Sequence, residues 1–195
     1  MFKKTFAFSI MAALLALLGA GIVGCPPEPE PNPNPEGPCT ERQFTVTVES
    51  LVPEIYFGHL LAVTHDDAVR VFEQNEVVTA EFLEFNWMNN TVPLEEVLAV
   101  TSGVTDVLAS EEHFVPLESD ETTMTMTITG CTDDVITLMT PQFYTSSSFA
   151  GLDSIQLPTA AAAVYDLEML TLDLNNAVIG DVGNTAIVRA TITPL

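Results

Sequence analysis

The chain alternates between apolar and polar residues in several segments, and the pattern is clearest in Thr122–Thr129. There, methionine and isoleucine alternate with threonine, which is the two-residue period of a half-buried β-strand. The same period appears in Phe44–Val48, in Val135–Thr140 and, less regularly, in Ala186–Thr193. A continuous apolar run, Phe57–Thr64, predicts a buried strand or loop. These segments together predict a mainly β fold.

A helical pattern lies between the first predicted strands and the later ones. In Glu76–Asn89, apolar residues three or four positions apart form one stripe, and their apolar neighbours widen it. The stripe consists of Val78, Phe82, Phe85 and Met88, widened by Val77, Leu83 and Trp87. We therefore expect a well-buried helix here.

Two shorter helices are predicted on either side of it. Asp66 and Asp67 are suited to cap a helix over Ala68–Gln74, because carboxylates favour a helix N-terminus. Pro93, followed by two glutamates, suits a helix that runs to Ala99. A turn before the last strand is marked by Gly180, Gly183 and Asn184. Antiparallel strands with two or three short inserted helices predict a β-sandwich.

The first 24 residues have the pattern of an export signal. Lys3 and Lys4 precede the apolar run Phe6–Leu18, and small residues follow. The signal ends in Ile22-Val23-Gly24-Cys25, which resembles the lipobox of bacterial lipoproteins. The resemblance implies that Cys25 carries fatty acyl chains such as palmitate, becomes the first residue of the mature protein and anchors it in a membrane.

A plain transmembrane anchor or an ordinary cleaved signal is the alternative interpretation of this stretch, since its apolar run is close to the roughly 20 residues of a span. The glycines at 19, 21 and 24 weaken that alternative, as does the lack of a Lys or Arg cluster after Cys25. Pro26 stands where an aspartate is associated with inner-membrane retention in some bacteria. We therefore expect the outer membrane or the cell surface.

The segment after Cys25 is rich in proline. Pro26–Pro38 reads PPEPEPNPNPEGP, a composition that cannot build a core and that favours extended polyproline II structure. We expect a signal peptide in residues 1–24, a lipidated cysteine and stalk in 25–42, and one folded domain in 43–195.

The charge of the domain is strongly negative. Lys3 and Lys4 are the only lysines, so the predicted mature chain keeps three arginines against all 27 acidic residues. Nucleic-acid binding requires a basic surface, so nucleic acid is excluded as a partner. Docking of the domain on anionic lipid is disfavoured for the same reason, and we expect membrane contact through the acyl chains. Such acidity suits a high-salt habitat or divalent cation binding, or it serves solubility alone.

Two cysteines remain besides Cys25. Cys39 and Cys131 are an even pair in a chain predicted to be exported, where disulfides persist. We expect them to form a disulfide, and two free thiols are the alternative. A zinc site is disfavoured because the Cys-x-x-Cys spacing is missing.

Seven short motifs follow one another in the order in which they occur in the spondin N-terminal domain. They are Val48–Leu51, Leu61–His65, Phe72–Leu94, Gly103–Val107, Leu138–Pro141, Ser148–Asp153 and Val164–Asp166. The segment 43–195 therefore resembles that family. The resemblance implies a C2-like β-sandwich and a non-enzymatic adhesion module that binds a protein or glycan ligand outside the cell.

Some members of that family hold a calcium ion, and the resemblance places candidate ligands in the last motifs. Asp153 and Asp166 match the family pattern, whereas Ser147 replaces an expected aspartate. Glu168 and Asp173 are the candidate substitutes. Calcium prefers six to eight oxygen ligands, several of them carboxylates. The alternative is that these four are solvated carboxylates on an acidic chain.

An enzyme is the less favoured function class. The chain contains no Gly-x-Ser-x-Gly motif to present a nucleophilic serine. His65 fits a structural role at a strand end next to Asp66. We therefore expect a lipid-anchored binding module of the cell envelope, with calcium as a candidate cofactor. The alternative is a structural envelope lipoprotein without an external ligand.

Overall fold

The computed structural model describes residues 39–52, 55–113, 123–143 and 147–195, with the backbone alone at 181–184. The chain divides into two compact units, Met1–Gly37 and Pro38–Leu195, and the fold below is that of the second. The predicted signal, the predicted acylation site Cys25 and the segment Pro26–Pro38 lie outside the described residues.

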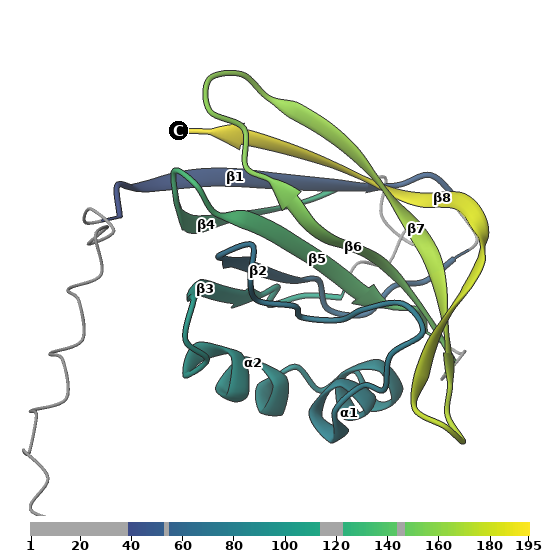
Figure 1. Ribbon diagram of the computed structural model, residues 1–195. Coiled ribbons are helices and arrows are strands. Elements are labelled where there is room, and N and C mark those ends of the chain that lie inside the picture. The colour runs from purple at the N-terminus through teal and green to yellow at the C-terminus, as the bar shows by residue number, and fades with distance from the viewer. Residues whose placement is uncertain (1–38, 53–54, 114–122, 144–146) are drawn as a thin grey trace, which may run out of the picture. The chain divides into compact units, whose positions relative to one another are not determined.

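Within the described residues, eight strands form one antiparallel sheet in the order β3-β2-β5-β6-β7-β8-β1-β4. The strands are β1 (Glu41–Ser50), β2 (Leu61–His65), β3 (Val104–Ala109), β4 (Thr123–Cys131), β5 (Val135–Pro141), β6 (Ser148–Gln156), β7 (Ala163–Asp173) and β8 (Val178–Pro194). The sheet curls until its edge strands β3 and β4 come into contact, so that it is nearly closed like a barrel (Figure 1). The predicted mainly β, antiparallel fold is confirmed.

Two short helices cover one face of the sheet (Figure 1). Helix α1 (Ala80–Met88) begins after Thr79, whose hydroxyl accepts a hydrogen bond from the N–H of Phe82, and it ends at Asn89 in the left-handed conformation. Helix α2 (Val92–Ala99) has Pro93 in its first turn, as predicted.

The core lies on both faces of β2 and β5, and every residue of these two strands is buried. Ala62 and Leu138 face the inside of the curled sheet, where they join Phe44, Val46 and Ile128. Their neighbours along the two strands, such as Leu61, Val63 and Met139, point to the opposite face. They pack against the helix residues Phe82, Phe85, Leu94 and Leu98. Burial on both faces explains why Phe57–Thr64 is continuously apolar instead of alternating.

The predicted helix over Glu76–Asn89 is too long, and its predicted stripe is partly wrong. Residues 75–78 are not helical and pair with the β7–β8 hairpin: the N–H of Asn75 donates to Ile179 O, and that of Val78 to Ala177 O. Only Phe82, Phe85 and Asn86 of α1 are buried. By contrast, Val77 is 70%, Trp87 68% and Met88 69% exposed.

Two further local predictions are wrong. Ala68–Gln74 is not helical, since it consists of turns and irregular backbone, although Asp66 Oδ1 does accept a hydrogen bond from the N–H of Ala68. Gly180, Gly183 and Asn184 lie inside the long strand β8. The turn before that strand falls at residues 174–177, where Ala177 has φ 54°.

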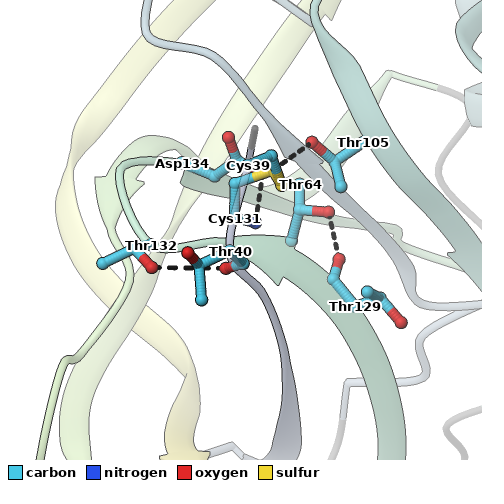
Figure 2. Close-up of a disulfide and its surroundings, with 8 residues drawn as sticks. All are labelled: Cys39, Thr40, Thr64, Thr105, Thr129, Cys131, Thr132 and Asp134. Atoms are coloured by element: carbon cyan, nitrogen blue, oxygen red, sulfur yellow. Dashed lines mark hydrogen bonds between the residues drawn. A yellow bond between two sulfur atoms is a disulfide. The ribbon is translucent and has the colours of Figure 1, made fainter. Parts of the chain in front are cut away.

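The predicted Cys39–Cys131 disulfide is confirmed, with a Cα–Cα distance of 5.5 Å (Figure 2). It joins Cys39, two residues before β1, to Cys131 at the end of β4, and Cys131 pairs with Glu41 of β1. The Thr105 hydroxyl of β3 lies 3.6 Å from the Cys131 sulfur. The Thr64 hydroxyl of β2 donates to Thr129 O of β4 at 2.5 Å. These contacts close the seam between the two ends of the sheet.

Candidate functional site

A surface pocket of about 330 Å³ lies between β6, β7 and the segment that follows β2. We call it the β6–β7 pocket. It is lined by Arg70, Phe72, Glu73, Gln74, Gly151, Leu152, Asp153, Asp166, Glu168 and Leu170. Four carboxylates and one guanidinium therefore share one small concave site, whose volume is at the lower end of the range for ligand pockets.

Strand periodicity places the acidic side chains in this pocket. Asp166, Glu168 and Leu170 are spaced two residues apart on β7, so they point to the same face. Gly151 of β6 pairs with Glu168, and Asp153 follows two residues later. A Cβ atom at Gly151 would lie 2.8 Å from Phe149 Cε2 and 2.9 Å from Phe72 Cζ. Glycine at 151 therefore lets the two phenylalanine rings pack directly beneath the pocket.

Two of the domain's three arginines lie at this pocket. Arg70 lines it, and its Nη1 lies 3.4 Å from Ser154 Oγ. Arg189 of β8 stands opposite Asp166 in the strand register and donates to it from Nε at 2.8 Å and from Nη2 at 3.3 Å. The hydrogen bond from Arg189 lowers the pKa of Asp166. Asp166 is thus an ionised carboxylate whose charge is already matched within the fold.

The carboxylate of Asp153 is held by a buried network. The Thr137 hydroxyl on β5 donates to Asp153 Oδ1 at 2.7 Å and accepts from the N–H of Ser154 at 3.0 Å. The fully buried His65 places Nε2 2.8 Å from the same hydroxyl and Nδ1 2.8 Å from the carbonyl oxygen of Asp66. The side chain of Asp153 therefore reaches, through Thr137, to the histidine on β2.

The partners of this network determine where its protons lie. The Asp66 carbonyl can only accept, so Nδ1 of His65 carries a hydrogen. The Thr137 hydroxyl donates to Asp153 Oδ1 and lies within hydrogen-bond distance of Nε2. His65 lies at the end of β2, and its hydrogen-bond partner on the following residue is the backbone carbonyl of Asp66.

The four predicted calcium ligands are only partly brought together. Asp153, Asp166 and Glu168 line the β6–β7 pocket. Asp173 lies at the other end of β7, where it accepts hydrogen bonds from Asn175 N–H at 2.9 Å and Asn176 Nδ2 at 2.7 Å. The bonds from Asn176 and then Asn175 lower the pKa of Asp173. Asp173 stabilises the β7–β8 turn.

These residues do not fit a preformed calcium site. Within the part of the chain that the structure describes, no three His, Cys, Asp or Glu side chains are placed to share one metal ion. Arg189 already neutralises Asp166, and Thr137 and Ser154 both donate to Asp153. The chemistry of the pocket is therefore that of several hydrogen-bond acceptors beside one cation.

Sequence analysis did not identify Arg70, Glu73 or Gln74 as pocket residues, because it placed them in a predicted helix. The scarcity of basic residues was the available signal. In a domain with three arginines, each one marks a place where positive charge has a specific partner.

Comparison with models of known protein families gives no match, and neither does comparison with curated proteins. Among the described residues, no helix has the length and apolar character that a membrane span requires.

Proposed function

We propose that this protein is a lipid-anchored binding module of the cell envelope, and that the β6–β7 pocket takes its ligand. Acylated Cys25 supplies the membrane anchor, and the domain that follows supplies recognition. The observation that carries the proposal is the meeting of Arg70, Glu73, Asp153 and Glu168 in one concave site. Polar groups converging in a pocket are the usual mark of a binding site.

The composition of the pocket favours a glycan over a protein surface as the ligand. Ionised carboxylates accept hydrogen bonds from hydroxyl groups, whereas Arg70 and Gln74 offer donors. Phe72 and Leu170 add apolar contact beside them. A small pocket lined with both acceptors and donors suits a sugar ring that carries several hydroxyls, and it requires no metal ion.

The resemblance to the spondin N-terminal domain supports an adhesion role. Three of its motifs fall on strands that are neighbours in the sheet: Leu61–His65 is β2, Leu138–Pro141 ends β5, and Ser148–Asp153 forms most of β6. A C2-like β-sandwich is the finer description of the curled sheet that this resemblance favours. Under this proposal the loops and pocket at one end of the sheet carry the ligand, and no catalytic step takes place.

The proposal is tested by binding of the purified chain to an array of neutral oligosaccharides, followed by titration of each sugar that binds. Glu168→Gln removes the charge of one pocket carboxylate and should weaken binding about tenfold or more, since a hydrogen bond to a charged group contributes about 1.5–3 kcal/mol. Glu111→Gln, at an exposed residue outside the pocket lining, is the matched control and should bind normally. Equal affinities of the two variants would contradict the proposal.

The second candidate is a structural envelope lipoprotein with no external ligand, which the acidic and lysine-free composition of the predicted mature chain favours. Cells that lack residues 43–195 distinguish the two functions. Loss of attachment with an intact envelope supports the binding module. An envelope defect with normal attachment supports the structural function.

A further inference from the structure

The helices carry apolar side chains that the fold does not cover. Nine large apolar side chains are exposed among the described residues, and six of them lie within residues 77–100. The six are Val77, Trp87, Met88, Val92, Val97 and Val100. Single exposed apolar residues are ordinary, whereas a group of them on neighbouring elements marks an interaction surface.

Five of these side chains belong to one helical pair, and we call them the outer helix face: Trp87, Met88, Val92, Val97 and Val100. Trp87 and Met88 form the last turn of α1, and α2 begins four residues after Met88. Val92 and Val100, the residue that follows α2, are eight residues apart, about two helical turns, so they lie on the same side, with the exposed Glu96 between them. The core contacts of the pair use other residues, namely Phe82, Phe85, Leu94 and Leu98.

We infer that the outer helix face rests on the lipid bilayer in which the acyl chains of Cys25 are inserted. This inference depends on the lipid anchor in the proposed function. Thirteen residues lie between Cys25 and Cys39, where the described domain begins, and a fully extended chain between the two cysteines spans at most about 50 Å. The domain is therefore held at a high local concentration beside the bilayer, where even a weak apolar contact is populated.

The chemistry of the face fits the interfacial region of a bilayer with zwitterionic lipids. Tryptophan prefers the headgroup level, where its apolar ring and its N–H are both accommodated. Neither α1 nor α2 contains a lysine or an arginine, and together they carry Glu81, Glu84, Glu95 and Glu96. Attraction to anionic lipid is thereby excluded as the source of binding, which must come from burial of apolar surface.

The four glutamates also disfavour a second copy of the chain as the partner of the outer helix face. A symmetric pair of outer helix faces would bring the four glutamates of one copy against the same four of the other. No basic residue on either helix would offset that repulsion. A zwitterionic lipid surface imposes no such penalty.

Trp87 is the only tryptophan of the chain, so its fluorescence reports on this face alone. The intact lipoprotein is reconstituted into phosphatidylcholine vesicles with and without brominated acyl chains, which quench tryptophan on contact. The matched control is the double variant Trp87→Phe/Val164→Trp. It moves the reporter to an exposed position near the start of β7, and Figure 1 shows β7 beginning at the opposite end of the domain from α1 and α2.

We expect strong quenching and a blue-shifted emission in the wild type, and neither in the double variant. Val97→Ser/Val100→Ser should reduce the quenching of Trp87 while circular dichroism stays unchanged. Equal quenching of wild type and control would overturn the inference, because the tether alone would then account for it. The inference would also be overturned if neither protein were quenched. The same holds if the emission of Trp87 changed with the amount of protein per vesicle and not with bromination of the lipid.

Flotation of the vesicles separates this inference from the anchor on which it depends. If the protein floats with the vesicles and Trp87 is not quenched, the anchor is correct and the docking face is wrong. If the protein does not float, the acylation of Cys25 is wrong and the docking inference is overturned with it. Glycan binding by the β6–β7 pocket is measured separately and is independent of both results.

Discussion

The carboxylate of Asp106 on β3 accepts a hydrogen bond from the backbone N–H of Thr129 on β4, with an Oδ2–N distance of 2.9 Å. The other oxygen of the same carboxylate accepts from the N–H of Val107 at 3.0 Å. Because β3 and β4 are the two edges of the sheet, one side chain bridges its ends and supplies part of the closure that backbone pairing does not.

Removal of this bridge should weaken the seam. Asp106→Ala leaves the N–H groups of Thr129 and Val107 without their charged acceptor, and we expect a loss of about 2–3 kcal/mol in the free energy of unfolding. Denaturant titration measures it. Asp133→Ala is the control, since Asp133 is an exposed acid close to the same end of β4. Equal losses in both variants would show that the bridge contributes nothing specific.

The disulfide should stabilise the domain through the unfolded chain. Cys39 and Cys131 are 92 residues apart, and a loop of that length corresponds to about 4–5 kcal/mol in the chain-entropy model. Reduction should therefore lower the midpoint of denaturant unfolding of the wild type. Cys39→Ser/Cys131→Ser should unfold at the midpoint of the reduced protein and be insensitive to reductant. Unchanged unfolding of the wild type on reduction would contradict the expectation.

The hydroxyl group of Thr137 should contribute more to the free energy of unfolding than its methyl group does. Thr137→Val keeps the shape of the side chain and leaves His65, Asp153 and the N–H of Ser154 without a partner at that position, which should cost about 1–3 kcal/mol. Thr137→Ser keeps the hydroxyl and loses one methyl, about 1 kcal/mol. The comparison of the two unfolding free energies is the measurement, and a Val variant more stable than the Ser variant would contradict the contribution of these hydrogen bonds.

The stability of the domain should fall as the pH drops below the ordinary histidine range. Burial, and then the neighbouring His59, lower the pKa of His113 from 6.5. The rings of the two histidines are 4.3 Å apart, and Asn89 Nδ2 lies 3.1 Å from His113 Nε2. Because the pKa of His113 is lower in the folded protein, the unfolded chain binds more protons than the folded chain between that lowered pKa and pH 6.5. The contribution of the neutral His113 to the free energy of unfolding is complete above pH 6.5. It is lost as the pH falls through the lowered pKa of the folded state.

Unfolding measured at several pH values between about 7.5 and 5 tests this directly. His113→Gln keeps an acceptor for Asn89 but cannot be protonated there, so its stability should depend less on pH than that of the wild type. The difference between the two proteins removes the contribution of all other titrating groups. Identical pH profiles would contradict the expectation.

Calcium should leave the melting temperature unchanged. Asp166 is paired with Arg189, and Asp173 holds the β7–β8 turn, so two of the four predicted ligands have other partners. The measurement compares excess calcium with chelator at one high ionic strength. An ion at 100 times its dissociation constant would add about 2.7 kcal/mol, which is easily detected. A rise that disappears in Asp153→Asn would show that the pocket rearranges around the ion.

The strands were predictable where a single face is buried. In β4, Met126 and Ile128 are buried and the intervening threonines are less so, as the alternation predicted. The sequence analysis did not identify Thr79 as the N-cap of α1, although threonine is a favoured capping residue. The pairing of residues 75–78 with the β7–β8 hairpin could not be predicted from the sequence pattern. That contact joins segments about 100 residues apart, and periodicity carries no information about it.

The site was predictable in part, through the family resemblance and not through strand periodicity. Asp153, Asp166 and Glu168 were identified and do line one pocket. Arg189 was not linked to Asp166, because that pair depends on the cross-strand register of β7 and β8. Trp87 was expected to be buried and is exposed. The expectation was wrong because an apolar stripe does not reveal how wide a helix face the sheet covers.

The position of the disulfide also has a mechanical consequence. A load transmitted through the predicted stalk would enter the domain at Cys39, and the covalent link passes it at once to Cys131 as well. Glu41 pairs with Cys131, so the first rungs of the β1–β4 ladder stand beside that link. Traction from the membrane side therefore cannot peel β1 away from β4 rung by rung. It must be borne by two strands together, which suits the proposed role in adhesion.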